Sequence, residues 1–388
     1  MAATTDQPRT DPQDPQPQDP PGGSPADADA TANEQSSLEG ESAETLRGYY
    51  RQMTLIRSFE MRSAEMYQRA KIGGYCHLNL GEEATVVGLM AGIEPRDYLF
   101  TTYREHGYAL ARGMAPGPVM AELFGKVTGV SGGRGGSMHL FDPKARLLGG
   151  YGIVGGQIPP ATGVAMAATY RHEPGPEAEA VMCLLGDGTT NIGAFHECLN
   201  LAGLWRLPIV YVIINNRLGM GTPVDKASAE PDLYKRGCSY RMPGVRINGD
   251  DVVTVRDATR AAMEQARVER QPSIIEAMSY RLRGHSVVDP AKYRSKEEAA
   301  QVREMDPLPA FRARLVEAGI LDEEQADTIE AEEAKRVADA VAFADESPDP
   351  QVADLFKYVY ATPVANAPTR LPADPVVTVP SSEQGVWA

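Results

Sequence analysis

Two short polar motifs, Gly186-Asp187-Gly188 and Asn215-Asn216, carry the clearest indication of chemistry in this chain of 388 residues. Each motif directly follows an apolar run, which predicts buried parallel strands over 180–185 and 209–214. Because the carboxyl ends of parallel strands meet at one edge of a sheet, a carboxylate and a carboxamide are expected side by side there. Such oxygens suit a small, hard divalent cation that also holds the phosphates of a ligand.

The elements between the two motifs are in the order that such a site requires. Gly186 and Gly188 allow a sharp turn and a close approach of the backbone to a ligand. Residues 191–203 have helical spacing, with one apolar face made of Ile192, Phe195, Leu199 and Ala202. The N-terminus of that helix offers unpaired N–H groups to an anion. A GDG motif by itself is also typical of an ordinary strand-to-helix turn, but its coupling to the Asn-Asn pair favours a diphosphate site.

Other loops add basic side chains. Arg104 can make a bidentate contact with phosphate oxygens, although an arginine beside Glu105 is also typical of a surface ion pair. His285 lies in a polar loop, 281–286, after a predicted strand over 273–278, where an imidazole can donate to a diphosphate or move a proton. His77 is equally compatible with a core or a surface position. Of the other histidines, His172 and His196 are interpreted as structural or solvated, and two are left open, His106 and His139.

The glycine-rich run over 130–137 resembles a phosphate-binding loop at first sight. It lacks the Gly-Lys-Ser/Thr ending of a P-loop, so the sequence disfavours nucleotide hydrolysis. A flexible loop is the simpler interpretation.

Together these motifs resemble those of thiamine diphosphate enzymes. The surrounding sequence is similar to the α subunits of E1 components of 2-oxo acid dehydrogenase complexes, most closely those acting on pyruvate. The resemblance runs from about Leu46 to about Tyr360 and is carried by segments 135–139, 152–155, 215–217, 219–222 and 283–286.

The resemblance implies two cofactors, thiamine diphosphate and Mg²⁺, and a role for each matching residue. The implied metal ligands are Asp187, Asn216 and the backbone carbonyl of Leu218. The implied cofactor-binding residues are Tyr103, Arg104, Gly152, Val154, Asp187, Gly188, Thr189, Asn216, Leu218 and His285. The implied catalytic residues are His77, which lines the substrate site, and His285, which takes part in acyl transfer to a lipoyl group.

The resemblance also implies partners and a reaction. The expected assembly is an α2β2 heterotetramer in which the β subunit supplies the carboxylate that activates the cofactor, together with a lipoyl-bearing E2 component. The expected reaction is oxidative decarboxylation of pyruvate with transfer of the acetyl group to E2. Acetoin or a branched-chain 2-oxo acid is the alternative substrate, and a non-catalytic diphosphate-binding scaffold or a phosphate-ester hydrolase is a more distant alternative.

One regulatory feature of animal relatives is only partly present. Ser286 matches a serine that is phosphorylated in those relatives, whereas Pro223 and Lys292 occupy the places of the other two. The sequence therefore argues against kinase control.

Composition is consistent with the fold class that the motifs and the resemblance imply. A chain with 42% hydrophobic residues and no internal repeat can bury one large core, and the lack of an apolar run near 18 residues predicts no membrane span. We expect a doubly wound parallel sheet of the thiamine diphosphate-binding type with a helical C-terminal extension. The predicted domain covers 42–365, followed by an irregular tail over 366–388. The four cysteines show no CxxC spacing and are expected to be free thiols.

Residues 1–41 form a separate, acidic segment. They contain seven prolines and nine acidic residues against one arginine, which accounts for −8 of the formal net charge of −15. Such a segment is predicted to be disordered. The acidic balance disfavours nucleic-acid binding, and the tail lacks the features of a transit or signal peptide, which predicts a bacterial-type cytoplasmic location.

Overall fold

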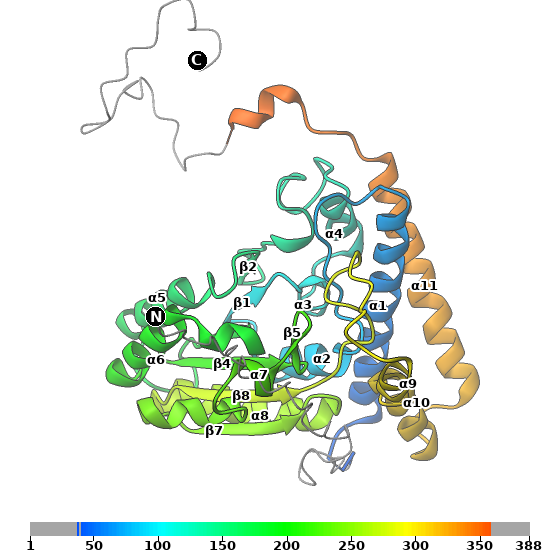
Figure 1. Cartoon of the computed structure of the whole chain (residues 1–388). Coiled ribbons are helices and arrows are strands. Elements are labelled where there is room, and N and C mark those ends of the chain that lie inside the picture. Colours follow the sequence, from blue (N-terminus) through cyan, green and yellow to red (C-terminus); the bar gives the residue numbers. More distant parts are fainter. Residues whose placement is uncertain (1–36, 39, 358–388) are drawn as a thin grey trace, which may run out of the picture. The chain divides into compact units, whose positions relative to one another are not determined.

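One parallel sheet organises the protein. The computed structural model of the chain describes residues 37, 38 and 40–357. Within that part, six parallel strands are arranged in the order β2-β1-β3-β4-β8-β7 (Figure 1). The strands are β1 (Tyr98–Thr102), β2 (Leu147–Tyr151), β3 (Val181–Gly186), β4 (Ile209–Asn215), β7 (Gly244–Asn248) and β8 (Ser273–Met278), and a short antiparallel pair is formed by β5 (Leu218–Gly219) and β6 (Thr222–Pro223).

Helices surround this sheet. The α-helices are α1 (Ala43–Gln68), α2 (Glu83–Gly92), α3 (His106–Ala111), α4 (Pro116–Leu123), α5 (Ile158–Arg171), α6 (Gly193–Trp205), α7 (Val224–Ala227), α8 (Val252–Glu269), α9 (Lys296–Glu304), α10 (Pro307–Glu317) and α11 (Glu323–Glu346). Shorter 3-10 segments are η3 (Gly136–Met138), η4 (Asp187–Asn191), η5 (Leu233–Tyr240) and η6 (Val352–Phe356).

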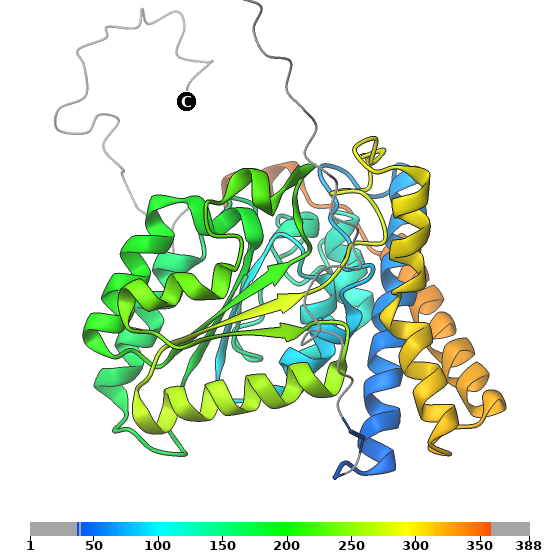
Figure 2. The same ribbon diagram turned by 60° about the horizontal axis from the view of Figure 1, so that its bottom comes forward.

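The core consists of two hydrophobic layers on opposite faces of the sheet (Figure 2). Along β3, Met182 and Leu184 point into the layer that includes α1, α2 and α8, whereas Val181, Cys183 and Leu185 point into the layer with α5 and α6. This alternation follows from the two-residue period of a strand, and burial on both faces explains the continuous apolar runs in the sequence. The predicted doubly wound α/β class is confirmed.

The strand order reverses between β1 and β3. From β1 the chain continues to β2 on one side, then returns across β1 to reach β3 and β4 on the other side. The helices after β1 and β3 pack in opposite layers, because α3 belongs to one hydrophobic cluster and α6 to the other. The loops therefore separate at the carboxyl ends of β1 and β3, which is where open α/β sheets bind ligands.

The predicted elements are all present, but the helix predicted over 191–203 is shifted by two residues to Gly193–Trp205. The strand over 273–278 has the predicted bounds, and the other two strands are shifted or extended by one residue. The helix begins at Gly193 rather than at Asn191, because Asp187–Asn191 form the 3-10 segment η4. The Thr190 hydroxyl donates to the Asp187 carbonyl at 2.8 Å, and Ile192 has extended backbone angles that separate η4 from α6.

The predicted helical extension is present as α9, α10 and α11. Helix α11 packs against α1 and α4, so it belongs to the unit that ends at Pro348. A second unit begins at Asp349, and its described part contains the short segment η6. The predicted boundary at 365, the tail over 366–388 and nearly all of the tail over 1–41 lie outside the described residues. None of the helices between residues 40 and 357 is both long and apolar enough to cross a bilayer.

The glycine-rich loop binds a carboxylate of the protein itself. Glu122 on α4 is fully buried, and its two carboxylate oxygens accept four backbone N–H groups of this loop. The donors are Ser131 and Gly133, each at 2.8 Å, Gly135 at 2.6 Å and Gly136 at 3.2 Å. Three of the loop glycines, Gly132, Gly133 and Gly136, have positive φ angles. The resemblance to a phosphate cradle thus has a structural cause, since an internal anion takes the place of the phosphate.

We predict that Glu122→Gln destabilises the protein by about 3 kcal/mol, because a charge-assisted acceptor is lost and an amide NH2 then faces N–H donors. Urea unfolding followed by circular dichroism measures the loss. Glu317→Gln, on the exposed end of α10, is the matched control and should leave the unfolding midpoint unchanged. A midpoint for Glu122→Gln equal to that of the control would contradict this account.

Candidate functional site

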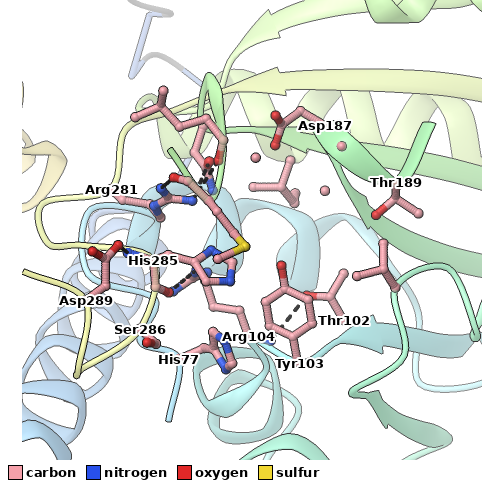
Figure 3. Close-up of a pocket in the computed structure, with 18 of the residues that line it drawn as sticks. His77, Thr102, Tyr103, Arg104, Asp187, Thr189, Arg281, His285, Ser286 and Asp289 are labelled. Atoms are coloured by element: carbon pink, nitrogen blue, oxygen red, sulfur yellow. Dashed lines mark hydrogen bonds between the residues drawn. The ribbon is translucent and has the colours of Figure 1, made fainter. Parts of the chain in front are cut away.

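A cavity of about 860 Å³ opens at the carboxyl edge of the sheet. Its walls come from the loops after β1, β2, β3, β4 and β8 and from the segment that precedes α2. All eleven residues that the sequence selected line it: His77, Tyr103, Arg104, Gly152, Val154, Asp187, Gly188, Thr189, Asn216, Leu218 and His285. Asp187 and Thr189 lie across the cavity from His77 and His285 (Figure 3).

The predicted metal ligands meet on one side of this cavity. Asp187 is buried, and burial raises the pKa of its carboxyl to about 6 against the opposing effect of Arg281. One guanidinium nitrogen of Arg281 donates both to Asn216 Oδ1 at 3.2 Å and to the Leu218 carbonyl at 2.9 Å. Two of the three predicted ligand oxygens therefore converge on a single cationic group. Carboxylate, amide and carbonyl oxygens are the donor set that Mg²⁺ prefers.

The glycine at 188 leaves room that the protein does not use. A Cβ at Gly188 would meet nothing closer than Gly219 Cα at 3.9 Å, and one at Gly186 nothing closer than Thr189 Oγ1 at 3.8 Å. Packing within the described chain therefore does not require glycine at these positions. The open space beside Asp187 fits a ligand that approaches the backbone closely, and so the residues present fit a metal-bound diphosphate.

Arg104 connects three segments around the cavity. Its guanidinium is buried and donates to the Leu78 carbonyl at 2.6 Å and to the His285 carbonyl at 2.9 Å. It also lies 3.9 Å from a carboxylate oxygen of Glu82. Arg104 thus connects buried segments of the chain and does not form a surface ion pair with Glu105. Three of its five N–H groups remain for other acceptors.

The two predicted catalytic histidines form a cluster with Tyr103 (Figure 3). The ring centroid of His77 lies 4.4 Å from that of Tyr103 and 5.0 Å from that of His285. Burial and the Arg104 charge lower the pKa of His77 to about 2 and that of His285 to about 4, so both rings are neutral near pH 7. Among the described residues neither Nδ1 atom has a hydrogen-bond partner, although both are buried. Each ring can therefore form a hydrogen bond with a ligand that enters the cavity.

Asp289 holds the His285 loop in place. Its carboxylate accepts the His285 backbone N–H at 2.6 Å, the Ala291 N–H at 2.8 Å and the Tyr293 hydroxyl at 2.7 Å. A Cβ at Gly284 would approach the Asp289 carbonyl oxygen to 2.5 Å, so the loop requires glycine there. These contacts fix the position of the His285 backbone at the edge of the sheet.

The remaining histidines have structural partners. His106 is fully buried and lies 2.8 Å from both Glu60 Oε2 and Ser137 Oγ, which links α1, α3 and η3. His139 Nδ1 lies 2.9 Å from the Gly150 carbonyl. The two histidines interpreted as structural or solvated are both exposed, with His172 beside Glu179 and His196 beside Tyr240. The four cysteines are free, as expected, and all but Cys238 are buried.

Sequence reasoning gave no role to three lining residues, Glu82, Arg281 and Asp289. Glu82 follows a turn glycine before α2, and nothing in its local pattern separates it from Glu83, whose carboxylate pairs with Arg57. Arg281 and Asp289 flank His285 in a polar loop after β8, and that position was an available signal. The contacts of Arg281 with Asn216 and Leu218 are tertiary, whereas those of Asp289 lie within its own loop, and residue type alone revealed neither.

The fold and the cavity define a class of protein: an open α/β sheet with a ligand-sized cavity at its switch point. The amino-acid sequence narrows the class. Residues 51–353 match the family of dehydrogenase E1 components, and the chain belongs to this family. The family resemblance drawn from the motifs is confirmed.

Several relatives are similar over most of their length. The chain is 44% identical over 308 residues to the pyruvate dehydrogenase E1 component subunit alpha of Rhizobium meliloti, covering 79% of this chain and 87% of the relative. It is 41% identical over 317 residues to the protein of that name from Zymomonas mobilis, covering 81% and 88%. It is 40% identical over 316 residues to the mitochondrial somatic form of pyruvate dehydrogenase E1 component subunit alpha from Homo sapiens, covering 81% of this chain and 79% of the relative.

A buried carboxyl group supports the loop that carries Arg104. Glu105 is fully buried, and burial raises its pKa well above the usual range. The Leu140 N–H donates to Oε1 at 2.7 Å. The Thr101 hydroxyl lies 2.8 Å from both Glu105 Oε2 and the Gly149 carbonyl. One hydroxyl proton cannot be directed at two acceptors, so a neutral Glu105 that donates to Thr101 satisfies the chain of hydrogen bonds.

We predict that Glu105→Gln becomes more stable relative to the wild type as pH rises. The folded state keeps a proton that the unfolded chain releases above about pH 4.3, so this contribution is complete below that pH and is lost as pH rises toward the folded pKa. Glutamine keeps both hydrogen bonds and does not titrate. Urea unfolding between about pH 5 and 8 should show the difference growing by up to about 1.4 kcal/mol per pH unit. A difference independent of pH, as expected for the Glu317→Gln control, would refute a neutral Glu105.

Proposed function

We propose that this chain is the α subunit of a pyruvate dehydrogenase E1 component, which decarboxylates pyruvate oxidatively and passes the acetyl group to a lipoyl-bearing E2 component. The observation that carries the proposal is that one cavity gathers all eleven residues that match the family's motifs. The relatives named above, with 40–44% identity, support pyruvate as the substrate.

The proposed cofactors are thiamine diphosphate and Mg²⁺. Asp187, Asn216 and the Leu218 carbonyl would hold the metal, and the diphosphate would be bound by Arg104, His285 and the backbone around Gly188. Tyr103, Gly152, Val154 and Thr189 complete the set of cofactor contacts. When bound, thiamine diphosphate supplies a thiazolium that stabilises the carbanion left when carbon dioxide is lost.

The two histidines are proposed to form hydrogen bonds with the substrate and the cofactor. Because burial and Arg104 keep the pKa values of His77 and His285 low, each ring has one N–H donor and one acceptor near pH 7. His77 can thus donate to an oxygen of the 2-oxo acid. His285 can donate its N–H to a diphosphate oxygen, and its position beside His77 suits a part in acyl transfer.

A β subunit is proposed to cover the cavity. Large apolar side chains around its mouth are unusually exposed, including Ile153 at 79%, Met220 at 66% and Tyr75 at 65%. Such an apolar rim is typical of a protein interface. Of the lining carboxylates, Glu82 and Asp289 hold neighbouring groups of the chain and Asp187 is the proposed metal ligand, which supports a β-subunit carboxylate as the activating group. The α2β2 assembly and the bacterial-type cytoplasmic location rest on the sequence.

We predict that Asp187→Ala weakens thiamine diphosphate binding in the presence of Mg²⁺ by about tenfold or more, because the only proposed anionic metal ligand is lost. Isothermal titration calorimetry on the complex with the β subunit measures the affinity. Asp257→Ala, on the exposed face of α8, is the control and should bind like the wild type. Equal affinity of the Asp187 variant would remove the metal role of this residue.

We predict that the chain together with its β subunit reduces an artificial electron acceptor with pyruvate, and that either subunit alone is inactive. Pyruvate, 2-oxoisovalerate and acetoin are compared in the presence of thiamine diphosphate and Mg²⁺. Preference for one of the other two substrates would keep the chemistry and change the substrate. Cofactor binding without turnover of any of them would favour the non-catalytic scaffold.

A further inference from the structure

The amide of Asn216 has a defined orientation in the cavity. Its Nδ2 group donates to Glu82 Oε1 at 2.9 Å, and its Oδ1 atom accepts from Arg281 at 3.2 Å. Rotating the amide by half a turn would set oxygen against the carboxylate and NH2 against the guanidinium. Both contacts would then be repulsive, because a carboxylate only accepts and a guanidinium only donates.

Glu82 is itself held rigidly. Its side chain is buried, and its second oxygen, Oε2, accepts from Asn79 Nδ2 at 3.1 Å. Asn79 is fixed in turn, because its Oδ1 atom accepts the Gly107 backbone N–H at 3.1 Å. The Arg104 Nε atom lies 3.9 Å from Glu82. The carboxylate therefore cannot turn away from Asn216 without breaking its hydrogen bond to Asn79 and its ion pair with Arg104.

The neighbouring asparagine is oriented in the same manner. Asn215 Nδ2 donates to the buried Glu276 at 2.6 Å, which leaves its Oδ1 atom to accept the Arg217 N–H at 2.9 Å. Each amide of the Asn-Asn pair thus has a buried glutamate on its NH2 side. For Asn215 the oxygen shapes the turn, whereas for Asn216 the oxygen faces the cavity.

The Asn216 oxygen and the Leu218 carbonyl share one nitrogen of Arg281. Their convergence marks a point where the protein presents negative potential to a cation. A divalent ion bound by the same two oxygens would replace these two hydrogen bonds. Only the observed orientation of the Asn216 amide supplies an oxygen at this point, because the reversed orientation would present NH2.

We propose that Glu82 is a positioning residue of the metal site: by accepting the Asn216 NH2 group, it keeps Oδ1 directed at the cation. The inference rests on the proposed function, since that function places the metal at Asn216 and Leu218. Outer-shell partners of this kind commonly change metal affinity by 10–100-fold when they are removed.

The test measures metal affinity rather than activity. Mn²⁺ replaces Mg²⁺ in sites made of oxygen ligands, and its free concentration is read by electron paramagnetic resonance on the complex with the β subunit in the presence of thiamine diphosphate. Glu82→Met, which has a similar length and no acceptor, is expected to weaken Mn²⁺ binding by about 10–100-fold. Glu333→Met removes another buried carboxylate, which lies on α11, pairs with Arg51 and does not line the cavity, and this control should bind Mn²⁺ like the wild type.

A double variant keeps the proposal testable if Glu82→Met does not fold. Glu82→Gln combined with Asn216→Asp exchanges donor and acceptor, so that the hydrogen bond persists and an oxygen still faces the metal. Its Mn²⁺ affinity should stay within about threefold of the wild type. If Glu82→Met binds Mn²⁺ as tightly as the wild type, or if a folded double variant binds it about tenfold or more weakly, the role proposed for Glu82 is overturned and the proposed function is unaffected. A wild-type complex that binds neither Mn²⁺ nor thiamine diphosphate would instead overturn the proposed function.

Discussion

The reversal of strand order between β1 and β3 is the constraint on which the site depends. Because the helices after these two strands pack on opposite faces, the loops separate and leave a crevice at the carboxyl edge of the sheet. Arg104 and Asp187 follow the two strands and so reach the crevice from either side. The loops after β4 and β8 then bring Asn216 and His285 to the same edge.

Buried glutamates hold the loops around this crevice. Glu122 accepts four N–H groups of the glycine-rich loop, and Glu82 and Glu276 each accept the amide of one asparagine. Glu105 is hydrogen-bonded to the Thr101 hydroxyl near the end of β1. Burial of a carboxyl is costly unless hydrogen bonds, ion pairs or protonation compensate. Here the compensating groups include backbone and amide donors of the loops, the Thr101 hydroxyl at Glu105 and the Arg246 guanidinium at Glu276. The same contacts that satisfy these side chains therefore give the loops a single conformation.

The cavity is held by these contacts, and it also has polar atoms without partners and open space. The two neutral imidazoles have unpartnered nitrogens among the described residues, and Gly188 leaves space beside the predicted metal ligands. Exposed apolar side chains surround the mouth. A cofactor and a covering subunit would satisfy the polar atoms and the apolar rim together, which explains why a shared site between two chains is the arrangement that we propose.

The sequence by itself determined the α/β class, three strands of the sheet and eleven of the residues around the cavity, most of them through the family resemblance. Apolar runs ending in GDG and Asn-Asn are local patterns, and their meaning follows from strand period and from the rule that ligands bind at carboxyl edges. Tertiary structure decided the start of α6, the occupation of the glycine-rich loop by Glu122, and the roles of Glu82 and Arg281. Those features depend on contacts between residues distant in sequence, such as Asn216 and Glu82, and on burial, which changes the pKa of a carboxyl such as Glu105 without leaving a local pattern.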